Sequence, residues 1–152
     1  MIMSTSTNVK VAVATMLVLA CASLVSCRNE TVITAGQLPE AAQTFLREYF
    51  PESPVSYVKK EKELKGSTYE AVLQDGTEID FDSKGEWDNV DCKSAAVPAA
   101  IVPFAVAGHV QANFPGQSIS KIDREHYGFE VELAGGLELR FDKDGKFVRI
   151  DD

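Results

Sequence analysis

The strongest constraint on this chain of 152 residues is an internal repeat. Residues 69–91 match residues 129–151 without a gap, at an offset of 60. Aromatic residues align with aromatic residues, as Trp87 does with Phe147, and glycines align with glycines. Upstream, residues 38–51 match residues 102–115 at an offset of 64. A repeat of this kind predicts one supersecondary unit that is used twice.

Each copy is predicted to open with a helix. Pro39 and Pro103 suit a first helical turn, where the missing N–H of proline has no intrahelical partner to lose, and a Phe-Pro pair closes each segment. In the first copy, apolar residues recur at helical spacing from Ala41 to Phe50. In the second copy, the apolar residues 97–102 precede Pro103, so this helix has either an apolar extension or a kink.

Strands are predicted after each helix because apolar and polar residues alternate. Residues 55–63 and 118–124 supply the first strand of each copy, and the matched segments 69–91 and 129–151 supply the others. One face of these strands is apolar. The other is polar and contains Glu70, Gln74, Glu78, Asp80, Glu130, Glu132, Glu138 and Arg140.

The predicted fold class is therefore α+β. It is a tandem repeat of a helix plus a four-stranded antiparallel meander, with residues 38–92 as the first copy and residues 93–152 as the second. The helices cover one face of the sheet and the other face is open to water. A unit of this size is marginal alone, so we expect the copies to share a core, preferably beneath one eight-stranded sheet.

Glycine-containing turns separate the predicted strands. The dipeptides at 75–76 and 135–136 are typical of type I′ hairpin turns, in which both central residues have positive φ. The loops 82–85 and 142–145 begin with Asp and end with Gly, and alternate carboxylates invite a calcium hypothesis. Side-chain-to-backbone hydrogen bonds from the first Asp explain the same pattern without a metal. We predict no metal site and no cofactor.

Residues 1–27 are predicted to be an export signal. Lys10 precedes the apolar run 11–25, which is short for a membrane-spanning helix; a retained membrane anchor is the alternative. Residues 24–27 look like a bacterial lipoprotein box that would place a lipid on Cys27, and ordinary cleavage after Ala22 is the rival interpretation.

The signal predicts where the rest of the chain resides. Residues 28–37 are polar and are predicted to be a short tether. The protein is then a periplasmic or outer-membrane lipoprotein of the cell envelope, attached to the membrane through its N-terminal lipid only.

Composition argues against several function classes. The formal net charge of −8 repels nucleic acid and favours basic partners. Cys92 would be the only cysteine left after signal removal and lipidation, and no spacing ties His109 or His126 to it as a catalytic base. Carboxylates spread over an open sheet face stay solvated and do not converge as catalytic pairs. We predict no enzymatic activity.

The open sheet face is the candidate binding surface. Trp87 and Phe147 follow the Gly turns at equivalent positions, where they are either anchors for a partner or residues that a bulge returns to the core. The full set of candidate partner-binding residues is Glu70, Val72, Glu78, Trp87, Glu130, Glu132, Glu138, Arg140 and Phe147.

The Leu/Val-Pro to Phe-Pro segment and the strands ending in Phe-Asp-x-x-Gly-x-(Trp/Phe)-x-x-(Val/Ile)-Asp resemble the PepSY-like family of exported bacterial proteins, also described as beta-lactamase-inhibitor-protein-like. The resemblance covers about residues 38–152. It implies a tandem α/β unit in the cell envelope and brings no catalytic residues. Related domains accompany peptidase propeptides or clasp an enzyme on the sheet face, but resemblance transfers a fold better than an activity.

We therefore predict a non-enzymatic envelope binding protein. It presents the open sheet face to a protein or peptide partner from the envelope or the secreted proteins. The alternatives are an inhibitor or chaperone of an exported peptidase, and a small-molecule or cation sensor.

Overall fold

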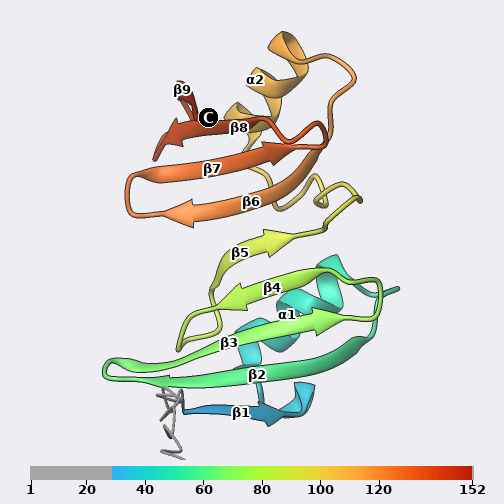
Figure 1. Cartoon of the computed structure of the whole chain (residues 1–152), viewed down its shortest axis with the longest axis vertical. Coiled ribbons are helices and arrows are strands. Elements are labelled where there is room, and N and C mark those ends of the chain that lie inside the picture. Colours follow the sequence, from blue (N-terminus) through green and yellow to red (C-terminus); the bar gives the residue numbers. More distant parts are fainter. Residues whose placement is uncertain (1–28, 152) are drawn as a thin grey trace, which may run out of the picture.

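The computed structural model describes residues 29–151 as an α+β protein with a single nine-stranded antiparallel sheet and two α-helices. The strands lie in the sheet in chain order, so each pairs with its neighbours in sequence. Figure 1 shows this sheet running along the length of the molecule. The strands are β1 (Glu30–Ile33), β2 (Val55–Glu63), β3 (Gly66–Leu73), β4 (Glu78–Phe81), β5 (Trp87–Asp91), β6 (Ile119–Glu125), β7 (Gly128–Leu133), β8 (Glu138–Asp142) and β9 (Phe147–Asp151).

The first strand was not predicted. Residues 29–37, which we expected to belong to a tether, contain β1 and a short 3-10 helix, η1 (Ala35–Gln37). β1 pairs with β2 along its whole length, from Glu30 opposite Glu61 to Ile33 opposite Val58. β1 forms because the free edge of β2 is available for pairing. Residues 30–33 do not alternate between apolar and polar side chains, so their own pattern does not predict a strand. The predicted signal and Cys27 lie outside the described residues.

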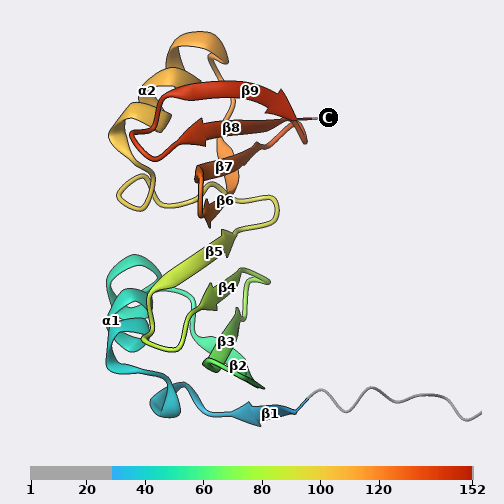
Figure 2. The same ribbon diagram turned by 90° about the vertical axis from the view of Figure 1, so that its left-hand side faces the viewer.

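The two helices begin where the prolines predict. α1 (Glu40–Tyr49) and α2 (Phe104–Asn113) start directly after Pro39 and Pro103. Residues 97–102 contain a turn at 99–101 and no helical residue, so they are neither a helical extension nor part of a kinked helix. Val97 and Ile101 in this stretch are buried in the core, which explains its apolar composition. Figure 2 shows α1 and α2 on the same side of the sheet.

The core lies between the helices and the apolar face of the sheet, and it is continuous from Leu38 to Phe141. Phe45 of α1 meets Phe81 edge to face, with ring centroids 5.7 Å apart. The ring of His109 in α2 meets Phe141 in the same way at 5.4 Å. Since Phe81 and Phe141 are almost fully buried, each helix is held to the sheet by an aromatic contact.

Cys92 belongs to this core. Its side chain is buried, and burial is the main reason why the pKa of its thiol is raised. A thiol that stays protonated is a poor nucleophile. The structure therefore places Cys92 in the core as a packing residue.

The glycine turns differ in one respect from the prediction. Type I′ turns would need positive φ at both central residues, but of the two dipeptides only Gly76 and Gly136 have it. The amide of Leu73 donates to the carbonyl of Thr77, so the loop has three residues and closes with a left-handed glycine. The type I′ prediction was wrong because the dipeptide pattern does not reveal loop length.

The longer loops behave as the hydrogen-bonding explanation predicts. Oδ1 of Asp82 accepts hydrogen bonds from the amides of Lys84 and Glu86 at 2.8 and 2.9 Å, and Asp142 accepts the equivalent pair. Gly85 and Gly145 close these loops with φ of 85° and 77°. Oδ1 of each Asp thus accepts two backbone hydrogen bonds. Among residues 29–151 there is no group of three or more side chains suited to hold a metal ion.

Candidate binding surface on the open sheet face

The sheet register aligns the residues of the open face in two rows across the strands. Directly opposed residues of an antiparallel pair share a face, so each row is continuous. The first row is Lys59, Glu70, Asp80, Asn89, Asp123, Glu130 and Arg140. The second row is Tyr57, Val72, Glu78, Asp91, Lys121, Glu132 and Glu138. We call these two rows together the acidic face.

Most of the predicted site residues lie on the acidic face. Those that do are Glu70, Val72, Glu78, Glu130, Glu132, Glu138 and Arg140. The prediction missed Asp91 and Asp123, which the pairing of β5 with β6 brings into the rows. It also left out Asp80, although strand alternation had placed this residue on the polar side.

Trp87 and Phe147 do not lie on the acidic face. Trp87 is only 9% exposed and faces Phe45 of α1, with ring centroids 6.3 Å apart. Phe147 stacks on His109 of α2 at 4.4 Å. Their prediction as partner anchors was wrong, and the alternative, a bulge that returns them to the core, is what the structure contains.

The bulge has a clear position in the first half. Asp80 is opposite Asn89, but the next residue, Phe81, is opposite Trp87, so Asp88 is an extra residue in β5. The register between β8 and β9 shifts at the equivalent place. One extra residue reverses the side-chain parity, and this turns both aromatic rings toward the helices.

Ion pairs neutralise part of the acidic face. Nζ of Lys59 lies 2.9 Å from Glu70, and Nζ of Lys121 lies 3.0 Å from Asp123. Lys93, beyond the end of β5, reaches both Glu78 and Asp91. Because these side chains keep contact with water, each pair is worth about 0–1 kcal/mol. Among the described residues, no cation pairs with Asp80, Glu132 or Glu138.

Asp80 has the most perturbed carboxyl group of this surface. It lines a hollow of about 440 Å³ on the open side of β2 to β5, together with Lys59, Glu61, Glu70 and Asp88. Partial desolvation raises the pKa of Asp80 to about 6, and the negative charges of nearby acids, Glu70 first among them, add to the shift. The ionised carboxylate is therefore held in an unfavourable environment that a positive charge would relieve.

Replacing Asp80 by asparagine is expected to raise the melting temperature at pH 7. The pKa of this carboxyl rises from 3.8 to about 6 on folding, so the folded state binds the proton more tightly. The stability that this group contributes therefore falls as the pH rises from about 4 to 6. The gain from Asp80→Asn should be complete above that window and vanish below it. Thermal unfolding across this range measures it, with Glu48→Gln on the exposed side of α1 as the control.

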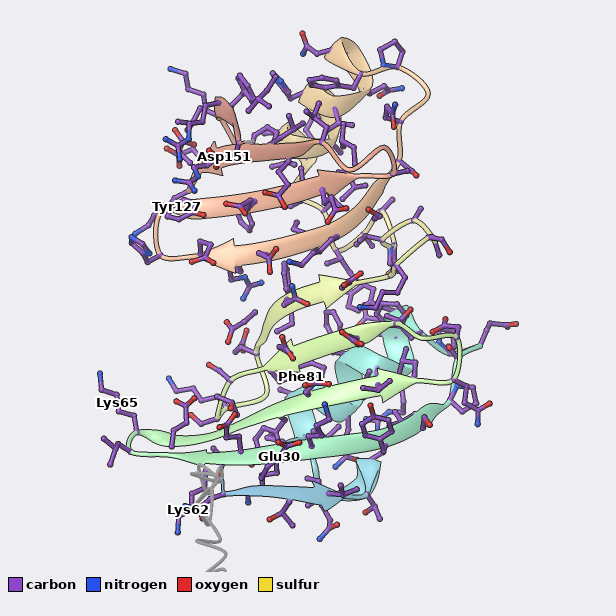
Figure 3. All side chains as sticks on the ribbon, in the orientation of Figure 1. Glu30, Lys62, Lys65, Phe81, Tyr127 and Asp151 are labelled. Carbon is purple, nitrogen blue, oxygen red and sulfur yellow. The ribbon has the colours of Figure 1, made fainter. Side chains whose placement is uncertain are left out.

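The other end of the acidic face is more rigidly connected. The hydroxyl of Tyr127 donates to Oε2 of Glu130 at 2.8 Å, and the guanidinium of Arg140 lies over the Tyr127 ring at 4.3 Å. Arg140 also pairs with Glu130 and with Asp151 of β9. Burial and the bond to Glu130 raise the pKa of Tyr127 to about 12, so its hydroxyl stays a donor. Figure 3 shows Tyr127 and Asp151 near each other in the C-terminal half.

The chemistry available on the acidic face is recognition of positive charge beside an apolar contact. Tyr57 is directly opposite Val72, and the centre of its ring lies 5.7 Å from Nζ of Lys59, a residue that lines the hollow containing Asp80. Tyr57 is 39% exposed and can pack against an apolar side chain. A ligand with a cationic group and a neighbouring apolar group would fit both features.

Comparisons with known proteins agree with this fold. A family model described as "Putative beta-lactamase-inhibitor-like, PepSY-like" matches residues 67–149. A solved structure from Bacteroides vulgatus, described as "a putative periplasmic protein of unknown function", is 38% identical, with a TM-score of 0.78 over 81% of this chain and 99% of that chain. Another from Bacteroides thetaiotaomicron, described as "a putative calcium-regulated periplasmic protein", is 35% identical, with a TM-score of 0.78 over 82% and 98%. No curated protein matches the chain.

The helices in the described part of the chain are all too short or too polar to cross a membrane.

Proposed function

Because the chain belongs to the PepSY-like, beta-lactamase-inhibitor-like family, we propose that it is a non-enzymatic binding protein of the cell envelope whose acidic face receives a basic segment of a protein or peptide. The observation that carries this proposal is Asp80, an ionisable group in an open hollow with no cation paired to it in the described structure. A lysine or arginine of the partner would lower its pKa and stabilise the charged form.

The cell envelope is proposed from two sources. The solved relatives are described as periplasmic, and residues 1–27 have the features of an export signal. We propose that a lipid on Cys27 holds the protein at the membrane. Acyl labelling of the protein, lost in Cys27→Ser, is the test.

We also infer that the two halves are copies of one helix-plus-meander unit. The matched segments have a bulge at the same position, after Asp80 and after Arg140. Gly85 approaches α1 and Gly145 approaches α2, since a Cβ at either position would come within about 3 Å of the helix. The duplication leaves two equivalent open surfaces side by side, which together make the acidic face.

One relative is described as "a putative calcium-regulated periplasmic protein", and calcium is therefore included in the test. An exported peptidase is one class of partner that could present a basic segment.

The proposed function is tested with full-length protein extracted from the envelope in mild detergent. The probe is a fluorescent extended peptide of alternating arginine and leucine, and anisotropy measures its binding. We expect Asp80→Lys to weaken binding at least about tenfold, or ~1.4 kcal/mol. The matched charge reversal is Glu48→Lys on α1. The wild-type affinity should fall between pH 7 and pH 5, as Asp80 becomes protonated near its pKa of about 6.

Equal weakening by the two charge reversals would mean that net charge alone attracts the peptide, and the proposal would be wrong. Calcium at millimolar concentration separates the cation hypothesis from the peptide hypothesis. Displacement of the peptide from wild type but not from Asp80→Asn would indicate that a cation occupies the same hollow.

A further inference from the structure

We propose that the outer edge of β9 pairs with β9 of a second copy of this chain, in antiparallel orientation and centred on Ile150. The pair would join two nine-stranded sheets into one. This inference does not depend on the proposed function, because it concerns backbone pairing at the outer edge of β9 and not the hollow at Asp80.

The first half of the protein contains an equivalent of this edge that is covered by another strand. β5 matches β9 in the repeat, and the side of β5 that faces away from β4 is covered by β6. Val90 of β5 is fully buried, whereas its counterpart Ile150 in β9 is 46% exposed. Val148 in the same strand is 54% exposed. β9 therefore presents apolar side chains and unpaired backbone groups along an edge that, in the first half, is covered.

The pairing of β5 with β6 shows which residue pairs join a strand to this kind of edge. Val90 is opposite Ile122, and the pair is flanked by Asp91 opposite Lys121. On the other flank, Nδ2 of the Asn89 side chain donates to Oδ1 of Asp123. An apolar pair between two complementary polar pairs thus joins the halves of the sheet.

A two-fold β9 pair centred on Ile150 reproduces this pattern. Ile150 would face Ile150 of the second copy, and Arg149 would face Asp151 on both sides. Arg149 is exposed and already lies 2.5 Å from Asp151 of its own strand, so its guanidinium sits beside the carboxylate that it would share. The same surface is used by both copies, and the assembly closes as a dimer.

Other registers are worse. Centring on Arg149 would place two guanidinium groups opposite each other, and centring on Val148 would place Ile150 opposite Lys146. Like charges directly opposed in a sheet are destabilising. A head-to-tail pair of β9 with β1 would leave a free edge at each end and produce an open filament.

Cysteine cross-linking of the full-length chain in its own envelope tests the register. In the proposed dimer the Cβ atoms of Ile150 would be about 5 Å apart, and those of Val148 about 14 Å apart. Mild oxidation should convert Ile150→Cys into a disulfide dimer, seen on a non-reducing gel. The matched control, Val148→Cys, is at least as exposed and lies in the same strand, and should stay at background. The unsubstituted protein, which keeps the buried Cys92, sets that background.

Two results of the cross-linking experiment would overturn the proposal. The first is a background level of dimer in Ile150→Cys. The second is an equal yield of disulfide dimer in both variants, which would indicate random collision. A second measurement uses the detergent-extracted wild-type protein in sedimentation equilibrium. Arg149→Glu turns both charge pairs into repulsive ones and should raise the dimer dissociation constant at least about tenfold. The exposed substitution Lys143→Glu is the control. A monomeric wild type, or no effect of Arg149→Glu, would also refute the two-fold pair.

Discussion

Replacing Phe141 by alanine is expected to lower the free energy of unfolding by about 3–5 kcal/mol. The Phe141 side chain is fully buried and contacts the rings of His109 and Phe147. Its loss removes apolar burial, opens a cavity and removes one of the two aromatic contacts that His109 of α2 makes with the sheet. A domain of this size has about 5–15 kcal/mol of stability in total, so the variant should be close to unfolding at growth temperature.

Urea unfolding of the full-length protein measures this effect. Trp87, the only tryptophan, reports on the first half of the sheet, and far-UV circular dichroism reports on the whole molecule. Because the core is continuous, Phe141→Ala should move both transitions together. The exposed substitution Val148→Ala is the control and should change stability by less than about 0.5 kcal/mol. A Trp87 transition that keeps its wild-type midpoint would show that the halves unfold independently.

Replacing Gly128 by alanine is expected to destabilise the protein by about 2–4 kcal/mol. Gly128 begins β7 with φ of 148°, and a Cβ there would lie 2.3 Å from the carbonyl oxygen of Phe141 in the neighbouring strand. Backbone atoms cannot move aside as a flexible side chain can. Gly128 of β7 is paired with Asp142 of β8, and the two strands would have to separate at this pair.

Gly135→Ala is the matched control in the following hairpin. Its φ is not in the left-handed region, and the nearest atom to a new Cβ would be 3.5 Å away, at the end of the flexible Gln117 side chain. Thermal unfolding of both variants should therefore show a large loss for Gly128→Ala and almost none for Gly135→Ala. Equal melting temperatures would mean that the strand backbone tolerates the contact.

The core, the open face and the outer edge of β9 are expected to have separate roles. Core and turn substitutions should change stability through the helix-covered side of the sheet. Substitutions at Asp80 should act on charge recognition at the open side, and substitutions at Ile150 and Arg149 on pairing at the sheet edge. Measurements of stability, peptide binding and dimerisation can therefore be assigned to different residues.

Sequence patterns alone were sufficient for much of the secondary structure. Pro39 and Pro103 mark both helix starts, because proline restricts the backbone locally and lacks a donor. The strand alternation places Glu130 and Glu132 on the open face and the intervening Val131 in the core, because side-chain direction reverses at each strand residue. The Asp-to-Gly loops are likewise a local property, since the carboxylate bonds the amides two and four residues further on.

Only the tertiary structure decided how these elements meet. β1 exists because β2 offers it an edge, and Asp123 joins Asp80 on one surface because β5 pairs with β6. A single bulge residue, Asp88, turns Trp87 from the open face to the core. Such contacts join residues that are far apart in the chain, so the local sequence around each residue does not predict them. Local rules determined both helices and most of the strands, and long-range pairing determined β1 and which side chains share a surface.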